Sequence, residues 1–285
     1  IKNVGMPLMK NIIIIMIESL TKSKMSYYGY KYNTTPFLDS LILKSKSFHN
    51  IYSSSIHTHD GIFATFYGLF SPFSEKTLNS TRNINYYGLP NILKDNGYSN
   101  YFFCGGDIMF DNMKFFLGNN GFDYVLGEQD FKGYSPENNW GLKDEDLYEV
   151  VLKSIDTIYK KRVPFFINIL TVSTHKYSNY PKTNVKPLFS NIEDNLYYYA
   201  DRSLEYFFKK AGNKEWFNNT VFIIEGDHGQ AFDSDYDIPL SYHTIPLIFY
   251  GLGEGNNYNL GSQVDITATI LSLLNMITNN IIFVN

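Results

Sequence analysis

The stretch FIIEGDHGQAF, residues 222–232, places an acid and an imidazole side by side directly after an apolar run. Glycines frame this pair, Asp227 and His228, and allow another group to approach the backbone closely. Glu18 stands in the same position after the apolar run NIIIIMI. Two carboxylates and an imidazole suit Zn²⁺ or Mn²⁺ better than Ca²⁺. For the Asp–His pair alone, the alternative is a turn with a capping role.

Histidines gather where predicted strands begin or end. Five of the six histidines lie in such segments, all but His49. His175 closes the stretch TVSTH, and His243 precedes the apolar stretch TIPLIFYG. In open α/β sheets, ligands bind beyond the carboxyl ends of the strands. The distribution therefore predicts a functional site at that edge of the sheet.

A threonine, Thr58, stands at the predicted start of the helix in THDGIFATFYGLF. Helix N-termini stabilise anions through free N–H groups and the helix dipole. A threonine hydroxyl bound to a divalent metal can ionise near neutral pH and act as a nucleophile. The alternative is that Thr58, or Asp60, simply caps the helix. We interpret His57 and His59 as local hydrogen-bonding groups rather than metal ligands.

Strand-like and helix-like segments alternate along the whole chain and must position these side chains. Residues 11–17 are continuously apolar and rich in β-branched types, which indicates a strand buried on both faces. Residues 35–46, 144–161 and 193–210 carry apolar side chains at helical spacing. The alternation predicts an α/β fold, a mostly parallel central β-sheet sandwiched between helices. Without an internal repeat or linker, residues 1–285 are expected to form a single domain.

The composition excludes several classes of protein. The chain has 285 residues, of which 44% are hydrophobic, enough for a substantial core. A net charge of -4 without a basic run argues against nucleic acid as a partner. The single cysteine, Cys104, excludes an intrachain disulfide. The apolar run before Glu18 is far shorter than the roughly 20 residues that cross a bilayer. Because the chain lacks an initiator Met, we expect a piece of a longer protein.

Taken in order, the motifs resemble the sulfatase-like branch of the alkaline phosphatase superfamily. Within it, the chain is similar to the lipoteichoic acid synthases and phosphoglycerol transferases. The resemblance covers nearly all of the chain, and the order of the motifs is more specific than any one of them. The matching stretches include NIIIIMIES, TTPFLDSL, HTHDGIFAT, GGDIMFDNMKFFLGNNGFD, NNWGLKDEDLY, PFFINILTVSTHKY, NNTVFIIEGDHG, IPLIFYG and QVDITATILSLL.

This resemblance implies a metal site and a nucleophile. Glu18, Thr58, Asp227 and His228 would hold one divalent metal ion, Mn²⁺ or Zn²⁺. Mg²⁺ is less favoured because one ligand is a histidine. Thr58 would be the nucleophile that becomes phosphorylated or glycerophosphorylated.

The resemblance also implies substrate-binding residues. His175 matches the family's substrate-phosphate histidine, and His243 matches a second phosphate-binding histidine of the phosphoethanolamine transferases. Asp107 and Asp111 lie where related enzymes bind the glycerol phosphate head group. Cys104 stands in a stretch where lipoteichoic acid synthases have a histidine and an arginine, and this stretch has no arginine. The identity of the head group is therefore left open. Two further motif positions, Trp140 and Asp144, are expected to be structural.

The implied activity is that of a metal-dependent phosphoryl-group transferase or phosphodiesterase. It would move phosphoglycerol or phosphoethanolamine from a phospholipid donor to an envelope glycan or lipid acceptor. Family members sit at the extracytoplasmic face of the bacterial cytoplasmic membrane, in the periplasm or at the cell surface. Membrane association is therefore expected through a segment absent from this chain.

Two other classes of function remain as alternatives. A true sulfatase would need a formylglycine made within a Cys/Ser-x-Pro-x-Arg motif, and the only cysteine is followed by GGDI. A catalytically inactive binding domain is the other alternative. It is disfavoured because the complete candidate set is retained.

Overall fold

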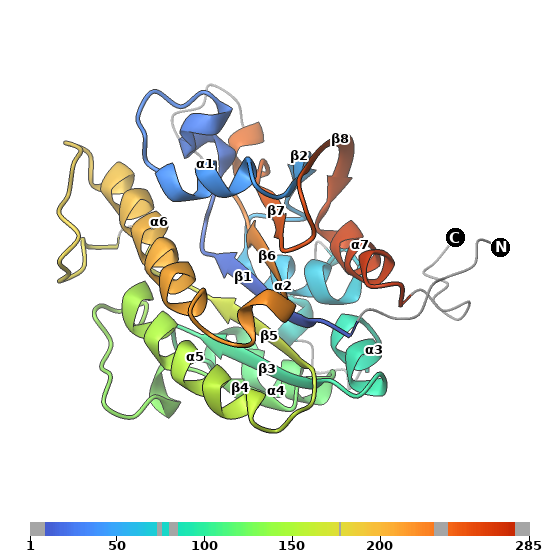
Figure 1. The fold of residues 1–285 in the computed structure, drawn as a ribbon. Coiled ribbons are helices and arrows are strands. Elements are labelled where there is room, and N and C mark those ends of the chain that lie inside the picture. The colour runs from blue at the N-terminus through green and yellow to red at the C-terminus, as the bar shows by residue number, and fades with distance from the viewer. Residues whose placement is uncertain (1–8, 73–75, 80–84, 177, 231–238, 277–285) are drawn as a thin grey trace.

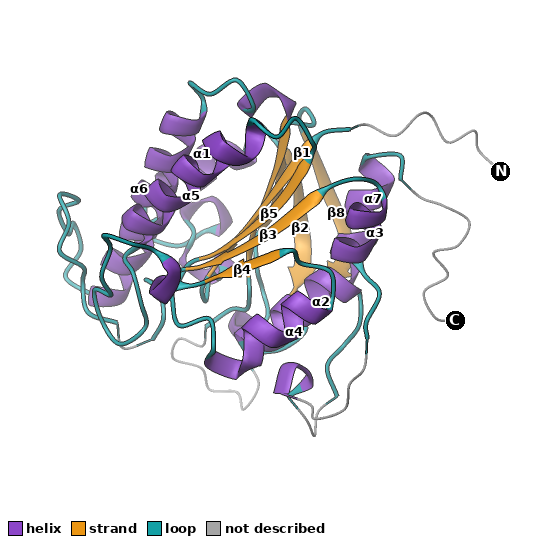
Figure 2. Cartoon of the chain, turned by 90° about the horizontal axis from the view of Figure 1, so that it is seen from below, coloured by secondary structure: helices purple, strands orange, loops and turns teal. Residues whose placement is uncertain are grey.

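Helices cover both faces of one β-sheet (Figures 1 and 2). The computed structural model describes residues 9–72, 76–79, 85–176, 178–230 and 239–276. Within these ranges eight strands form the sheet, in the order β4-β3-β5-β1-β6-β7-β2-β8. Among the strands described, only β7 runs antiparallel to its neighbours. The prediction of an α/β fold with a mostly parallel central sheet is confirmed.

The central strand β1 is buried along its whole length, as its continuous apolar sequence predicts. Alternate side chains of a strand point to opposite faces, so even-numbered and odd-numbered isoleucines of β1 enter two different cores. The strands are β1 (Asn11–Ile17), β2 (Lys46–Tyr52), β3 (Ser99–Cys104), β4 (Tyr124–Leu126), β5 (Phe165–Leu170), β6 (Thr220–Gly226), β7 (Leu247–Tyr250) and β8 (Gly255–Ser262).

Each face of the sheet has its own helical layer. The first core lies between the sheet and α2 (Thr58–Tyr67), α3 (Leu89–Asp95), α4 (Met113–Asn119) and α7 (Ile266–Leu273). The second core lies between the sheet and α1 (Pro36–Ile42), α5 (Asp144–Tyr159) and α6 (Ile192–Ala211). The long helices predicted over residues 144–161 and 193–210 are present within two residues of the predicted bounds. No helix in the described residues is long and apolar enough to cross a bilayer.

The register of the central strands brings their carboxyl ends to one level. Met16 in β1 lies opposite Leu170 in β5 and Glu225 in β6. The segments that follow these strands, which include Glu18 and Asp227, therefore emerge together at one edge of the sheet. This is the edge where a parallel α/β sheet binds its ligands.

Two local predictions are wrong. The helix expected over residues 35–46 ends at Ile42, where the Ser47 hydroxyl donates to the Ile42 carbonyl at 3.0 Å, and Lys46 already belongs to β2. Neither Thr58 nor Asp60 caps α2. His57 is the N-cap, and Thr58 is the first helical residue. The Thr58 side chain is consequently available to the strand ends that it faces.

Candidate active site

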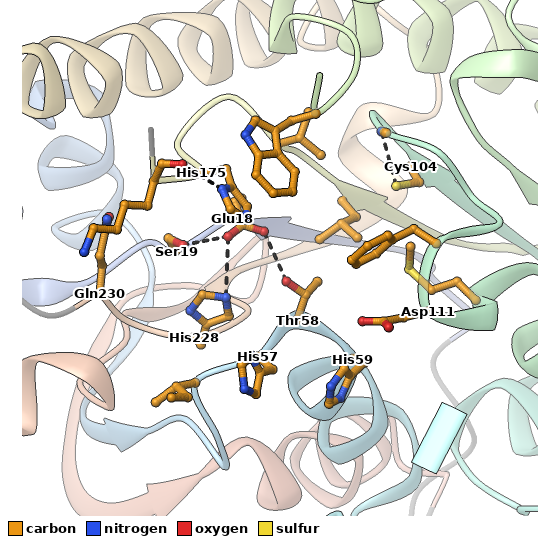
Figure 3. A pocket seen from close by; sticks show the side chains of 18 of the residues that line it. Glu18, Ser19, His57, Thr58, His59, Cys104, Asp111, His175, His228 and Gln230 are labelled. Carbon is orange, nitrogen blue, oxygen red and sulfur yellow. Dashed lines mark hydrogen bonds and ion pairs between the residues drawn. The ribbon is translucent and has the colours of Figure 1, made fainter. Parts of the chain in front are cut away.

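Four residues predicted as metal ligands come together at the carboxyl edge of the sheet. Glu18 follows β1, Asp227 and His228 follow β6, and Thr58 begins α2. One ligand atom from each of Glu18, Asp227 and His228 lies within 4.8 Å of the others. The Thr58 hydroxyl donates to Oε2 of Glu18 at 3.2 Å, and His228 Nε2 is 3.4 Å from Oε1 of the same carboxylate (Figure 3).

The electrostatics of this cluster reflect two buried acids around one imidazole. Burial raises the pKa of Asp227 to about 7, and repulsion from Glu18 adds to this effect. Burial also acts to raise the pKa of Glu18, but the hydrogen bond and charge of His228 outweigh it and lower that pKa to about 2. For His228, burial would lower the pKa, but the two carboxylates raise it to about 10. The two carboxylates thus favour a positive charge at this place.

A divalent metal ion fits these residues. Asp227 is fully buried, and its Oδ2 atom has no hydrogen-bond partner. A buried carboxylate oxygen without a partner carries a large desolvation penalty. Carboxylates, a histidine nitrogen and a hydroxyl form a mixed oxygen and nitrogen set of the kind that holds Zn²⁺ or Mn²⁺. A cation here would neutralise both acids and bind Oδ2, which lies 3.6 Å from His228 Nε2.

The sequence did not reveal Ser19, which organises both carboxylates. Its backbone adopts a left-handed conformation, with φ of 54°, which is uncommon for a residue with a side chain. In this conformation its N–H donates to Asp227 Oδ1 at 2.7 Å and its hydroxyl donates to Glu18 Oε1 at 2.6 Å. The buried hydroxyl of Tyr197 in α6 donates to the Ser19 carbonyl at 2.6 Å. The only sequence signal was a serine after a candidate ligand.

Glycine at position 61 lets α2 approach the strand end. A Cβ atom on Gly61 would overlap the carbonyl oxygen of Asp227. The same carbonyl accepts a hydrogen bond of 2.6 Å from Nε2 of Gln263, whose Oε1 accepts from the Ser54 N–H at 2.9 Å. These contacts place the first turn of α2, and with it Thr58, against β6.

A cavity of about 510 Å³ opens over the cluster (Figure 3). His175 lies on its wall, with Nδ1 2.9 Å from the carbonyl of Lys176. Asp107 and Asp111 also line it. Asp111 pairs with the Lys76 ammonium at 2.8 Å, so this part of the wall holds charges of both signs.

The structure does not bring His243 to the cavity. This residue is absent from the cavity lining, and its Nδ1 lies 3.4 Å from the hydroxyl and the carbonyl oxygen of Ser53. The segment before β7 holds it in this position, because the His243 carbonyl accepts from the Ser53 N–H at 2.6 Å. A direct role for His243 in binding phosphate is therefore not supported by this geometry.

His57 and His59 do line the cavity, beside Thr58.

Comparison with known proteins gives a family and a set of relatives. A model of the sulfatase family matches residues 10–276. Phosphoglycerol transferase I of Escherichia fergusonii is 27% identical over an alignment of 237 residues, and the match covers 76% of this chain and 30% of that protein. The proteins of the same name from Salmonella paratyphi B and Salmonella newport match to the same extent. The chain thus spans about 30% of the length of the curated relatives it matches.

Solved structures share the fold. An alkaline phosphatase superfamily protein from Vibrio parahaemolyticus is 28% identical, with a TM-score of 0.85 over 94% of this chain and 68% of that chain. The lipoteichoic acid synthase LtaP from Listeria monocytogenes is 23% identical, with a TM-score of 0.85 over 96% of this chain and 74% of that chain. At this identity LtaP supports the fold alone. With a family model that spans nearly all of the described residues, the chain belongs to the sulfatase family, within the alkaline phosphatase superfamily.

Proposed function

We propose that this chain is the catalytic domain of a metal-dependent phosphoryl-group transferase with Thr58 as its nucleophile. The observation that carries the proposal is the 3.2 Å hydrogen bond from the Thr58 hydroxyl to Glu18, inside the buried ligand cluster. Glu18, Asp227, His228 and the Thr58 oxygen would hold the metal ion. When bound, the ion would lower the pKa of the threonine hydroxyl and stabilise negative charge on a phosphoryl oxygen.

The residues of the chain itself would orient the nucleophile, stabilise negative charge and transfer a proton. Glu18 orients the Thr58 oxygen by accepting its hydrogen bond. The hydroxyl would lose its proton to solvent, and the oxygen would attack the phosphorus of a phosphodiester while the bond to the leaving alcohol breaks. The N–H groups at the start of α2 would stabilise the developing negative charge. Nδ1 of His175 donates to the Lys176 carbonyl, so in the protonated imidazole Nε2–H would be the group that donates to the phosphate or passes its proton to the leaving alcohol. The hydroxyl of an acceptor then attacks the Thr58 phosphodiester and releases Thr58.

The relatives support a substrate class. Because the matching curated proteins are named phosphoglycerol transferases, we infer a phospholipid donor and an envelope glycan or lipid acceptor. One structural neighbour is described as the periplasmic domain of EcEptC from Escherichia coli, with a TM-score of 0.65. We extend that location to this chain and propose that it acts at the extracytoplasmic face of a membrane. Water in place of the acceptor would make the enzyme a phosphodiesterase.

Sulfate ester hydrolysis is a weaker candidate. A formylglycine would have to stand where Thr58 begins α2, and the only cysteine, Cys104, instead ends β3. Cys104 is buried, and burial raises the pKa of its thiol far above neutrality. The arrangement therefore favours phosphoryl transfer.

Replacement of Thr58 tests the nucleophile. In Mn²⁺- or Zn²⁺-loaded protein, Thr58→Ala should abolish turnover of bis-(p-nitrophenyl) phosphate and of fluorescent phosphatidylglycerol or phosphatidylethanolamine. Thr58→Ser should retain part of the activity, because the hydroxyl remains. Mass spectrometry of the wild-type peptide that contains Thr58 should show a phosphoryl or glycerophosphoryl adduct. Near wild-type turnover by metal-loaded Thr58→Ala would contradict the covalent route and leave a metal-assisted hydrolase.

A further inference from the structure

His175 stands on a loop that is anchored through its backbone. The hydroxyl of the preceding residue, Thr174, donates to the Glu18 carbonyl, and the His175 N–H donates to the Val172 carbonyl at 3.2 Å. Among the residues that the structure describes, the imidazole has one hydrogen bond, from Nδ1 to the carbonyl of Lys176. That acceptor belongs to the next residue on the same exposed loop. A second contact is needed to fix the plane of the ring.

Trp140 supplies this contact. The ring centroids of Trp140 and His175 are 3.4 Å apart, and the ring planes are inclined by 22°. This is a stacked arrangement, in which rotation of the imidazole would require the indole to move. Both side chains line the cavity above the metal-ligand cluster.

The indole is held by a scaffold that is separate from the His175 loop. The segment of residues 137–142 docks on the end of β3, where the Leu142 N–H donates to the Gly105 carbonyl at 2.8 Å. A Cβ atom on Gly106 would overlap the Trp140 carbonyl, and a Cβ on Gly141 would overlap the Gly105 carbonyl. Gly141 also has a φ of 136°, which residues with a side chain rarely adopt. The glycines after β3 thus permit the close approach that places Trp140.

Two hydrogen bonds also join the same two segments. Asp144 Oδ1 accepts from the Ser173 N–H at 3.3 Å, and the Asp144 N–H donates to the Ser173 hydroxyl at 3.2 Å. Ser173 lies two residues before His175, and Asp144 is fully buried at the start of α5. The segment that carries Trp140 and Asp144 therefore contacts the His175 loop in two places. Asp144 bonds to Ser173, and Trp140 stacks on the imidazole of His175.

We propose that Trp140 is a positioning residue for His175: its indole fixes the plane of the imidazole so that Nε2 stays directed at the reacting phosphate. The catalytic part of this statement rests on the proposed function, whereas the orientation of the imidazole does not. A purely structural role would bury the indole in a core, yet 37% of the Trp140 surface is exposed at the cavity. The proposal gives the tryptophan of the NNWG motif a role other than the structural one that the family resemblance suggests.

Nuclear magnetic resonance of the histidine rings tests the positioning without any turnover. A proton stacked over an indole experiences its ring current, so the ring protons of His175 should resonate upfield of those of the other five imidazoles. Histidine-labelled wild-type protein and His175→Asn assign the signal. Trp140→Leu should remove the upfield shift and leave the ring in several orientations, seen as broadened or multiple signals. Trp140→Phe, which keeps an aromatic plane, should retain a smaller upfield shift and one orientation.

Turnover of bis-(p-nitrophenyl) phosphate tests the consequence for catalysis. Trp140→Leu should lower kcat by roughly 10²-fold, the loss expected when a catalytic group is displaced by about 1 Å, and should alter KM far less. Trp140→Phe should restore most of the rate. Phe110→Leu is the matched control, because Phe110 also lines the cavity with an exposed aromatic ring. It should leave the His175 signal unchanged.

The two measurements separate the two proposals. If the wild-type protein turns over no phosphodiester, the proposed function fails, and the ring signals still decide whether Trp140 orients His175. A single sharp His175 signal in folded Trp140→Leu, or an unshifted signal in the wild type, would overturn the positioning role. So would a kcat of folded Trp140→Leu equal to that of the wild type, wherever turnover is measurable.

Discussion

At the scale of single residues, Ser19 shows how one side chain can order a whole ligand set. Its left-handed backbone turns the N–H toward Asp227, while its hydroxyl reaches Glu18. Mutation of groups that orient metal ligands typically lowers metal affinity by roughly 10- to 100-fold. A strained backbone conformation at such a place is typical of functional sites.

Substitution of Ser19 should weaken metal binding without unfolding the protein. Ser19→Gly removes the hydroxyl, keeps the N–H and adopts the left-handed conformation without strain. We expect its affinity for Mn²⁺ or Zn²⁺ to fall roughly 10- to 100-fold, as measured by isothermal titration calorimetry. Ser154→Ala is the control, since that hydroxyl donates only to a carbonyl within α5, at 2.8 Å. Wild-type affinity in Ser19→Gly would show that the hydroxyl has no part in ordering Glu18.

At the scale of elements, a buried carboxylate on α6 joins two helices of the same layer. Asp201 accepts hydrogen bonds from the backbone N–H groups of Phe37 and Leu38, at 2.9 and 2.8 Å, in the first turn of α1. These N–H groups have no partner within their own helix. Burial nevertheless raises the pKa of Asp201 to about 7, because the loss of water outweighs the two hydrogen bonds.

This shift predicts how Asp201 makes stability depend on pH. In the unfolded chain the pKa of an aspartate is about 3.9, so the folded state binds the proton more tightly. The stabilisation from this group is complete below about pH 4 and is lost as the pH rises through about 7. Urea unfolding should show the free-energy advantage of the wild type over Asp201→Asn shrinking between about pH 4.5 and pH 8. The exposed Asp95→Asn is the control. An advantage that grows with pH would contradict the raised pKa.

At the scale of the whole molecule, the proposed metal site joins segments that are far apart in the sequence. Glu18 follows β1, Thr58 begins α2 and Asp227 follows β6, so a bound ion would link the strands at the centre of the sheet to the helical layer. An ion that binds only the folded state stabilises it by about 2.7 kcal/mol at 100 times its dissociation constant.

Removal of metal should therefore lower the melting temperature. For a domain of this size, about 2.7 kcal/mol corresponds to a shift of roughly 5–10 °C, measured by calorimetry in chelator and then in excess Mn²⁺ or Zn²⁺. Asp227→Asn should melt at nearly the same temperature in both conditions, because a ligand is lost. Equal melting temperatures for the metal-treated and chelated wild type would contradict a metal site in this cluster.

The sequence by itself determined those elements whose buried faces produce a regular spacing of apolar residues along the chain. The continuous apolar run of β1 and the amphipathic stripes of α5 and α6 predicted those elements, because burial on two faces or on one leaves a distinct periodicity. It also predicted that Glu18 and Asp227 would meet, since both follow strands of one parallel sheet. The sequence pattern did not predict β8. Its sequence GNNYNLGS is mostly exposed at the edge of the sheet and has few apolar residues.

Only the tertiary structure decided how the site is held together. The left-handed turn at Ser19, the stack of Trp140 on His175 and the position of His243 away from the cavity depend on contacts between segments far apart in the sequence. Such contacts follow from strand register and from the close approach of loops at glycines. Neither can be predicted from a short segment of the sequence, because both depend on residues elsewhere in the chain. Local patterning fixes what each segment becomes, whereas the packing of segments fixes which side chains face one another.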